Sequence, residues 1–120
     1  MARLPAIGKI SAAVFNELIF PHLGAKKGDI LVGPQHGVDT GIVSIGNRAV
    51  AMTTDPVFIV PEYGFKKAAW FAIHILVSDV VTSGLPPAYL TIDLNLPMAM
   101  NEQELVTIWT TIDEECKKWG

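Results

Sequence analysis

One two-residue turn constrains the fold of this chain more than any other feature. Gly46-Asn47 separates two largely apolar runs, Thr40 to Ile45 and Arg48 to Thr54. A glycine-containing pair of this type closes a tight hairpin, because glycine adopts the backbone angles that such turns require. The sequence therefore predicts two adjacent antiparallel strands in this region.

Three segments have the apolar spacing of a helix. The first runs from Ser11 to Leu23, where Pro21 should disturb the last turn before Gly24, and the second covers residues 65–83, which contain neither Gly nor Pro. The third begins at Asn101, with Glu104 three residues later, as in a capping box. The faces expected to be buried are Ala69, Ile73, Leu76, Val77 and Val80 in the second helix, and Leu105, Ile108, Ile112, Cys116 and Trp119 in the third.

Two further segments are predicted strands. Residues 29–32 form a short apolar run, and apolar side chains alternate with polar or small ones from Tyr89 to Asn95, as in a strand with one buried face. The resulting order is helix, strand, hairpin, helix, strand, helix. This order predicts a single α+β domain over residues 1–120, with a mainly antiparallel sheet covered by helices.

Composition excludes some classes of function and favours an interface. The net charge is −3 and no basic cluster is present, so no nucleic-acid partner is expected. The longest apolar run, AAWFAIHILV, is too short for a membrane span, and MARLPAIGKIS lacks the apolar core of a signal peptide, so a cytoplasmic protein is expected. Half of the residues are hydrophobic and the mean hydropathy is +0.37, so some apolar surface should lie at an interface, and a homodimer is predicted.

Two other residues have simple expectations. Cys116 is the only cysteine and lies among apolar helical positions, which favours a buried and inert thiol. His74 lies on a largely apolar helix, which favours a hydrogen-bonded core residue over a catalyst.

Three aspartates occupy positions where a fold can present functional groups. Asp39 lies at the mouth of the first hairpin strand, Asp55 at the end of the second, and Asp79 in the central helix. Mg²⁺ commonly binds one or two carboxylates and bridges to phosphate oxygens, so converging aspartates would suit it. Spacing alone leaves structural roles open, since Asp39 can cap a turn, Asp55-Pro56 can start one and Asp79 can pair with a lysine.

Three sequence blocks together carry a resemblance. Residues 37–43 read GVDTGIV, residues 53–55 read TTD and residues 78–87 read SDVVTSGLPP. In this order and spacing the chain resembles the N-terminal domain of the aminoimidazole ribonucleotide synthetase (PurM-like) superfamily. Residues 17–24, ELIFPHLG, look closest to the branch of the hydrogenase-maturation protein HypE.

The resemblance implies a function and a set of site residues. Members use MgATP to phosphorylate an oxygen, often of an amide or carbamoyl group, and dimerise by joining their sheets into a shared barrel with nucleotide nearby. The HypE branch further implies a maturation partner protein. By this resemblance Mg²⁺ would be held by Asp39, Asp55 and Asp79, and ATP would be contacted by Lys9, Asp39, Thr53, Thr54, Asp55, Ser78 and Asp79.

The sequence also departs from the family pattern. Val38 replaces a usual acid, Leu76 stands where asparagine is frequent, and the glycine-rich phosphate loop is reduced to Gly8-Lys9. Relatives carry a second domain that would follow Gly120, and no catalytic residue is assigned here, so the isolated chain is expected to be inactive. The alternative function is a non-catalytic dimerisation or binding module.

Overall fold

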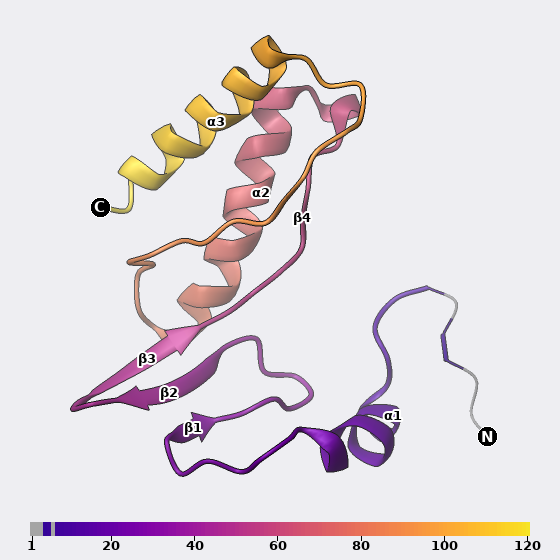
Figure 1. Ribbon diagram of the computed structural model, residues 1–120, viewed down its shortest axis with the longest axis vertical. Helices are drawn as coiled ribbons and strands as arrows, with labels where there is room; N and C mark the ends of the chain where they lie inside the picture. Colours follow the sequence, from indigo (N-terminus) through magenta and orange to yellow (C-terminus); the bar gives the residue numbers. More distant parts are fainter. Residues whose placement is uncertain (1–3, 6) are drawn as a thin grey trace. The chain divides into compact units, whose positions relative to one another are not determined.

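The chain forms two compact units, which are described separately. The computed structural model describes residues 4, 5 and 7–120 and divides the chain into Met1–Met52 and Thr53–Gly120 (Figure 1). No helix in these described residues is both long and apolar enough to cross a bilayer.

The first unit begins with the predicted helical segment, which changes type along its length. It consists of α1 (Ala12–Val14), a π-helical turn η1 (Phe15–Ile19) and a 3₁₀ turn η2 (Phe20–His22). The hydroxyl of Ser11 accepts a hydrogen bond from the amide of Val14 at 3.2 Å and caps the start. Pro21 lies in η2, where its missing N–H costs least, so the predicted disturbance of the last turn is confirmed.

The predicted hairpin is confirmed and belongs to a three-stranded antiparallel sheet. Its strands are β1 (Ile30–Val32), β2 (Gly41–Ile45) and β3 (Arg48–Met52), in the order β1-β2-β3. Gly46 has φ of 62°, which a β-branched residue could adopt only with strain. β3 ends at Met52, two residues before the predicted end.

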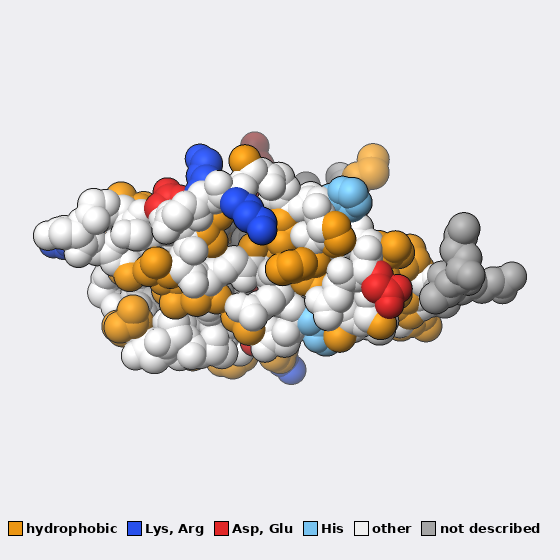
Figure 2. Space-filling model, turned by 90° about the horizontal axis from the view of Figure 1, so that it is seen from below, with side chains coloured by type: hydrophobic (Ala, Val, Ile, Leu, Met, Phe, Trp, Pro, Cys, Tyr) orange, Lys and Arg blue, Asp and Glu red, His pale blue; other side chains and the backbone are white. Residues whose placement is uncertain are grey.

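One face of this sheet is apolar and largely uncovered within its own unit. The strand register places five hydrophobic side chains on that face, and we name this set the apolar sheet face: Ile30, Val43, Ile45, Val50 and Met52. Arg48, opposite Ile45 at the hairpin end, lies at the edge of the same face. Ile45 is 60% exposed and Met52 46% exposed. Figure 2 shows patches of hydrophobic side chains on one side of the molecule, between backbone and polar groups.

The second unit contains the hydrophobic core. Its elements are β4 (Val57–Phe58), η3 (Pro61–Tyr63), α2 (Phe65–Val80), η4 (Val81–Ser83), β5 (Leu94–Asn95) and α3 (Glu102–Lys117). The helices α2 and α3 lie side by side, and β4 and β5 pass along α2 (Figure 1). The core consists of Val57, Ile59, Ala68, Ala69, Ala72, Ile73, Leu76, Ile108 and Ile112.

The predicted start of α3 is confirmed in its atomic detail. The side chain of Asn101 accepts from the amide of Glu104 at 3.0 Å, and the carboxylate of Glu104 accepts from the amide of Asn101 at 2.9 Å. This reciprocal capping box satisfies two amides that would otherwise lack partners at the helix end.

The predicted strand from Tyr89 to Asn95 is mostly wrong. Only Leu94 and Asn95 pair, and they run parallel to β4 through Val57↔Leu94 and Phe58↔Asn95. The alternating pattern is present, but β4 offers only two residues as partners, so the rest of the segment is extended without a ladder. β4 itself was not predicted, and its pairing with β5 is parallel, whereas the predicted sheet is mainly antiparallel.

The predicted helix faces are correct at their centres and wrong at their edges. Ile73 and Ile108 are almost fully buried. In α3, Leu105 and Trp119 remain partly exposed, while Thr111 and Glu115 are buried instead. The apolar residues Phe71 and Ile75 on the other side of α2 predict that this helix is covered from two directions, but they are 39% and 53% exposed, so the second cover is not found within the unit.

Candidate nucleotide and metal site

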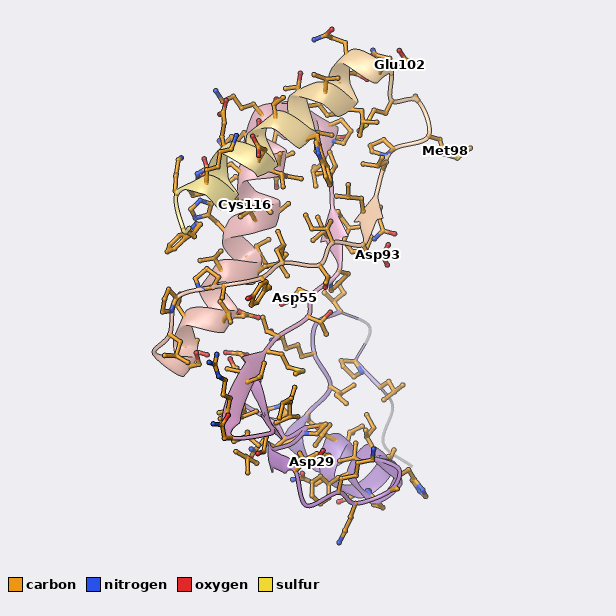
Figure 3. All side chains as sticks on the ribbon, turned by 60° about the vertical axis from the view of Figure 1, so that its left-hand side comes forward. Asp29, Asp55, Asp93, Met98, Glu102 and Cys116 are labelled. Atoms are coloured by element: carbon orange, nitrogen blue, oxygen red, sulfur yellow. The ribbon has the colours of Figure 1, made fainter. Side chains whose placement is uncertain are left out.

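Asp55 contains an unusual buried oxygen. It lies in the segment that leads from β3 to β4, at the start of the second unit (Figure 3). Its Oδ2 atom is buried and makes no hydrogen bond, and among the described residues it is the only buried side-chain nitrogen or oxygen in this condition. Burying such an atom without a partner costs free energy, and a bound cation or a hydrogen-bond donor would offset that cost.

The chain direction brings Asp79 to the same end of the second unit as Asp55. β4 and α2 run in opposite directions, so the residues before β4 and those at the end of α2 lie toward one end (Figure 1). Asp79 is half-buried in the last turn of α2, and Ser78 beside it is exposed. The structure therefore gathers two carboxylates at this end.

Hydroxyl groups accompany these carboxylates. Thr53 is half-buried and Thr54 exposed, directly before Asp55. At the end of α2 the hydroxyl of Thr82 donates to the carbonyl of Asp79 at 2.7 Å, and that of Ser83 donates to the carbonyl of Val80 at 2.7 Å. These bonds occupy carbonyls of the final helical turn, which otherwise lack partners.

The electrostatics at this end favour a cation. The C-terminal end of a helix carries a partial negative charge, and α2 ends beside Asp79. Two carboxylates add to that charge, so a phosphate group by itself would be repelled.

Two predicted site residues belong to the first unit. Asp39 is exposed and lies two residues before β2, and Lys9 is exposed near the beginning of the chain. Thr53, Thr54, Asp55, Ser78 and Asp79 belong to the second unit, whereas Lys9 and Asp39 belong to the first.

The carboxylates in the second unit suit a Mg²⁺ ion that takes only one or two protein ligands. In the part of the chain that the structure describes, no group of three or more His, Cys, Asp or Glu side chains could hold a metal ion. Mg²⁺ does not require such a cage, since it commonly takes one or two carboxylates and completes its shell with waters and phosphate oxygens. The unpartnered oxygen of Asp55 is the feature that fits this cation.

The departures from the family pattern have different structural consequences. Leu76 is 8% exposed and belongs to the core, so it supports packing and offers no polar group. Val38 is exposed beside Asp39 in the first unit. The asparagine frequent in relatives therefore has no counterpart at position 76.

A buried acid that the sequence analysis missed connects the two helices. Glu115 is 5% exposed, and its carboxylate accepts from Nε2 of His74 at 3.0 Å and from Nζ of Lys118 at 2.6 Å. Trp70 stacks on the His74 ring with centroids 3.8 Å apart. The expected hydrogen-bonded role of His74 is confirmed. The spacing of Glu115 from Ile108 and Ile112 puts it on the buried stripe of α3, which was the available signal.

The surroundings of Glu115 and Cys116 change the acidity of both. The hydrogen bond from Lys118, followed by that from His74, lowers the pKa of Glu115 below its ordinary value of 4.5. Burial, and then the charges of Asp113 and Glu115, raise the pKa of Cys116. A raised pKa leaves less thiolate at neutral pH, in agreement with an inert thiol.

These features define an α+β domain in which acids gather at one end of a helix-covered unit. Residues 37–120 match the family described as AIR synthase related protein, N-terminal domain, and the chain belongs to that family. The superfamily predicted from the three sequence blocks is thereby confirmed, since all three lie within the matched residues. No curated protein and no solved structure was found to match the chain.

Glu115→Gln should make the stability of the fold vary less with pH in the acid range. Because the pKa of Glu115 is lowered by folding, its ionised pairs stabilise the fold above pH 4.5 and are lost as the pH falls through the lower folded-state value. We expect the difference in urea midpoint between wild type and Glu115→Gln to be largest near about pH 6 and to shrink toward about pH 3.

Glu114→Gln is the matched control, because Glu114 is the exposed neighbour on the same helix. It should leave the urea midpoint nearly unchanged across this range. A wild-type advantage over Glu115→Gln that grows as the pH falls would contradict the assignment.

Proposed function

We propose that this chain is the nucleotide-binding and dimerisation lobe of an ATP-dependent enzyme of the AIR synthase-related family. The observation that carries the proposal is the buried, unpartnered Oδ2 of Asp55, in a segment that the family match includes. The enzyme would use MgATP to phosphorylate an oxygen of an amide or carbamoyl group. This substrate class rests on the resemblance to the superfamily.

Each residue of the site has a proposed role. By the resemblance to the superfamily, Asp39, Asp55 and Asp79 would be the ligands of Mg²⁺. Hydroxyls of Thr53, Thr54 and Ser78, and the ammonium group of Lys9, would contact the phosphates of ATP. When bound, the metal would neutralise phosphate charge, and the chain's own acids would set its position.

Within the superfamily, the proposal assigns the chain to the HypE branch. It is supported by residues 17–24, whose run ELIFPHLG forms the helical turns η1 and η2 of the first unit. These residues precede the matched range of 37–120, so the branch rests on the resemblance alone. A maturation partner protein would follow from this branch.

A non-catalytic binding module is the alternative function. The observation that favours it is the burial of Leu76, which leaves the acidic end without the polar side chain frequent at that position in relatives. Under this alternative the domain would keep its dimerisation role, and the unpartnered oxygen of Asp55 would bind only water.

Asp55→Asn should abolish metal-dependent ATP binding while leaving the domain folded. The neutral amide removes the charge that the metal requires and keeps the size of the side chain. Titration calorimetry with ATP, in Mg²⁺ and in chelator, should show binding by the wild-type chain only with Mg²⁺. Asp55→Asn should show none in either condition.

Asp93→Asn is the matched control, because Asp93 is an exposed acid just before β5 (Figure 3). It should bind MgATP like the wild type. Equal ATP affinity of the wild type with Mg²⁺ and with chelator, or no binding at all, would favour the binding-module alternative.

We also propose that the protein is a homodimer joined through the apolar sheet face. Four of its five side chains, Ile30, Ile45, Val50 and Met52, are exposed within their unit. An apolar face of this extent is costly in water and marks an interface. This arrangement agrees with the shared barrel that the resemblance implies.

Light scattering at micromolar concentration should give twice the chain mass of 13.0 kDa. Val50→Lys should weaken the dimer at least about tenfold, because it places a charge on the apolar sheet face. Ala49→Lys is the control on the same strand, because Ala49 points to the opposite face. A wild-type mass of one chain would contradict the proposal.

A further inference from the structure

An apolar groove runs along the exposed side of α2. It has a volume of about 480 Å³ and its walls are formed by Phe58, Val60, Tyr63, Lys67, Phe71 and Ile75. Ala68 and Ala72 form its floor, and small side chains at this spacing let another element approach the helix closely. We name it the α2 groove. It lies wholly within the second unit.

The α2 groove has a positive mouth in an otherwise acidic unit. Residues 53–120 contain four lysines, and two of them, Lys117 and Lys118, pair with Asp113 and Glu115. Lys67 instead lies over the ring of Phe71, with Nζ 5.8 Å from the ring centroid, and forms none of the ion pairs found among the described residues. The groove therefore suits an apolar segment flanked by acids.

The same unit presents such a segment on the outer side of α3. Glu102, Val106, Trp109 and Asp113 follow one another at intervals of four, three and four residues, which places them on one helix face. Val106 is 52% and Trp109 54% exposed, so two apolar side chains protrude between the exposed Glu102 and Asp113, whose carboxylate pairs with Nζ of Lys117 at 2.6 Å. We name this set the α3 ridge. The α3 ridge protrudes and carries acidic side chains, whereas the α2 groove is concave and carries Lys67 at its mouth.

We propose that the α3 ridge of one copy docks into the α2 groove of a second copy. Trp109 is the anchor, because exposed tryptophans entering apolar grooves dominate interfaces of this kind. In this contact Lys67 faces Glu102, the ridge acid that forms none of the ion pairs found among the described residues. Within one copy the two surfaces are held apart, since α3 packs on α2 through Ile73, His74 and Glu115 while the α2 groove opens beside β4 and η3.

Because the contact joins different surfaces of the two copies, it does not close on itself in a dimer. A head-to-tail contact of this kind leaves one free groove and one free ridge at the ends, so association continues with concentration. The groove is small for a stable interface, so we expect dissociation constants of about 0.1 mM. The contact is distinct from the apolar sheet face, which lies in residues 1–52.

Mixing two defective variants tests the proposal sharply. Phe71→Asp removes the groove and Trp109→Asp removes the ridge, and each change replaces a partly exposed side chain. In sedimentation velocity from about 10 µM to about 0.5 mM, the wild-type mass should rise with concentration and each variant alone should not. An equimolar mixture should regain association, because each variant keeps the surface that the other lacks.

A charge-reversed pair provides an independent check that spares the apolar contacts. Lys67→Glu and Glu102→Lys should each weaken association, and their mixture should restore it. Met98→Asp is the control, because Met98 is fully exposed on the loop before α3 (Figure 3) and belongs to neither surface, and it should behave like the wild type.

Two results would overturn the proposal. One is a wild-type mass that does not change with concentration. The other is a mixture of Phe71→Asp and Trp109→Asp that sediments as the average of its separate components. Because Val50→Lys changes only the first unit, it should leave the concentration-dependent step in place, so failure of the sheet-face dimer and failure of this contact can be told apart.

Discussion

The packing of α2 against α3 supports the second unit and everything positioned by it. Ile73 and Ile108 meet in the core, and Ala68, Ala69 and Ala72 let the neighbouring elements approach α2 closely. Because this contact holds α2 in place, the end of the helix lies toward the segment that carries Asp55. The buried pair of His74 and Glu115 connects the same two helices beside the core.

One oxygen at this end of the second unit, the Oδ2 of Asp55, has no hydrogen-bond partner among the described residues. Asp55 buries an oxygen without a partner, and Asp79 lies where the helix already contributes negative charge. A structural explanation would lead us to expect a lysine or a donor group against the buried oxygen. Since none is present among the described residues, a metal that also binds phosphate offers the most economical account of the site.

The parts of the fold that sequence predicted are those with local causes. The turn at Gly46, the capping box at Asn101 and the spacing of Ile108 and Ile112 act over a few residues and were all found. The pairing of Leu94 with Val57 depends on a strand distant in sequence, so its parallel direction and short length were missed. For the site, the motifs identified the aspartates, but the burial of the Asp55 oxygen depends on tertiary packing.

Paramagnetic broadening by Mn²⁺ tests the central claim most directly, because Mn²⁺ can replace Mg²⁺ at oxygen ligands and broadens nearby amide signals. In spectra of the full chain with ATP, substoichiometric Mn²⁺ should selectively broaden the amide signals of residues 53–55 and 78–83. The acidic stretch 113–115 provides an internal control for unspecific attraction of the ion. Broadening centred on residues 113–115, with the amide signals of residues 53–55 unchanged, would contradict a metal site at Asp55.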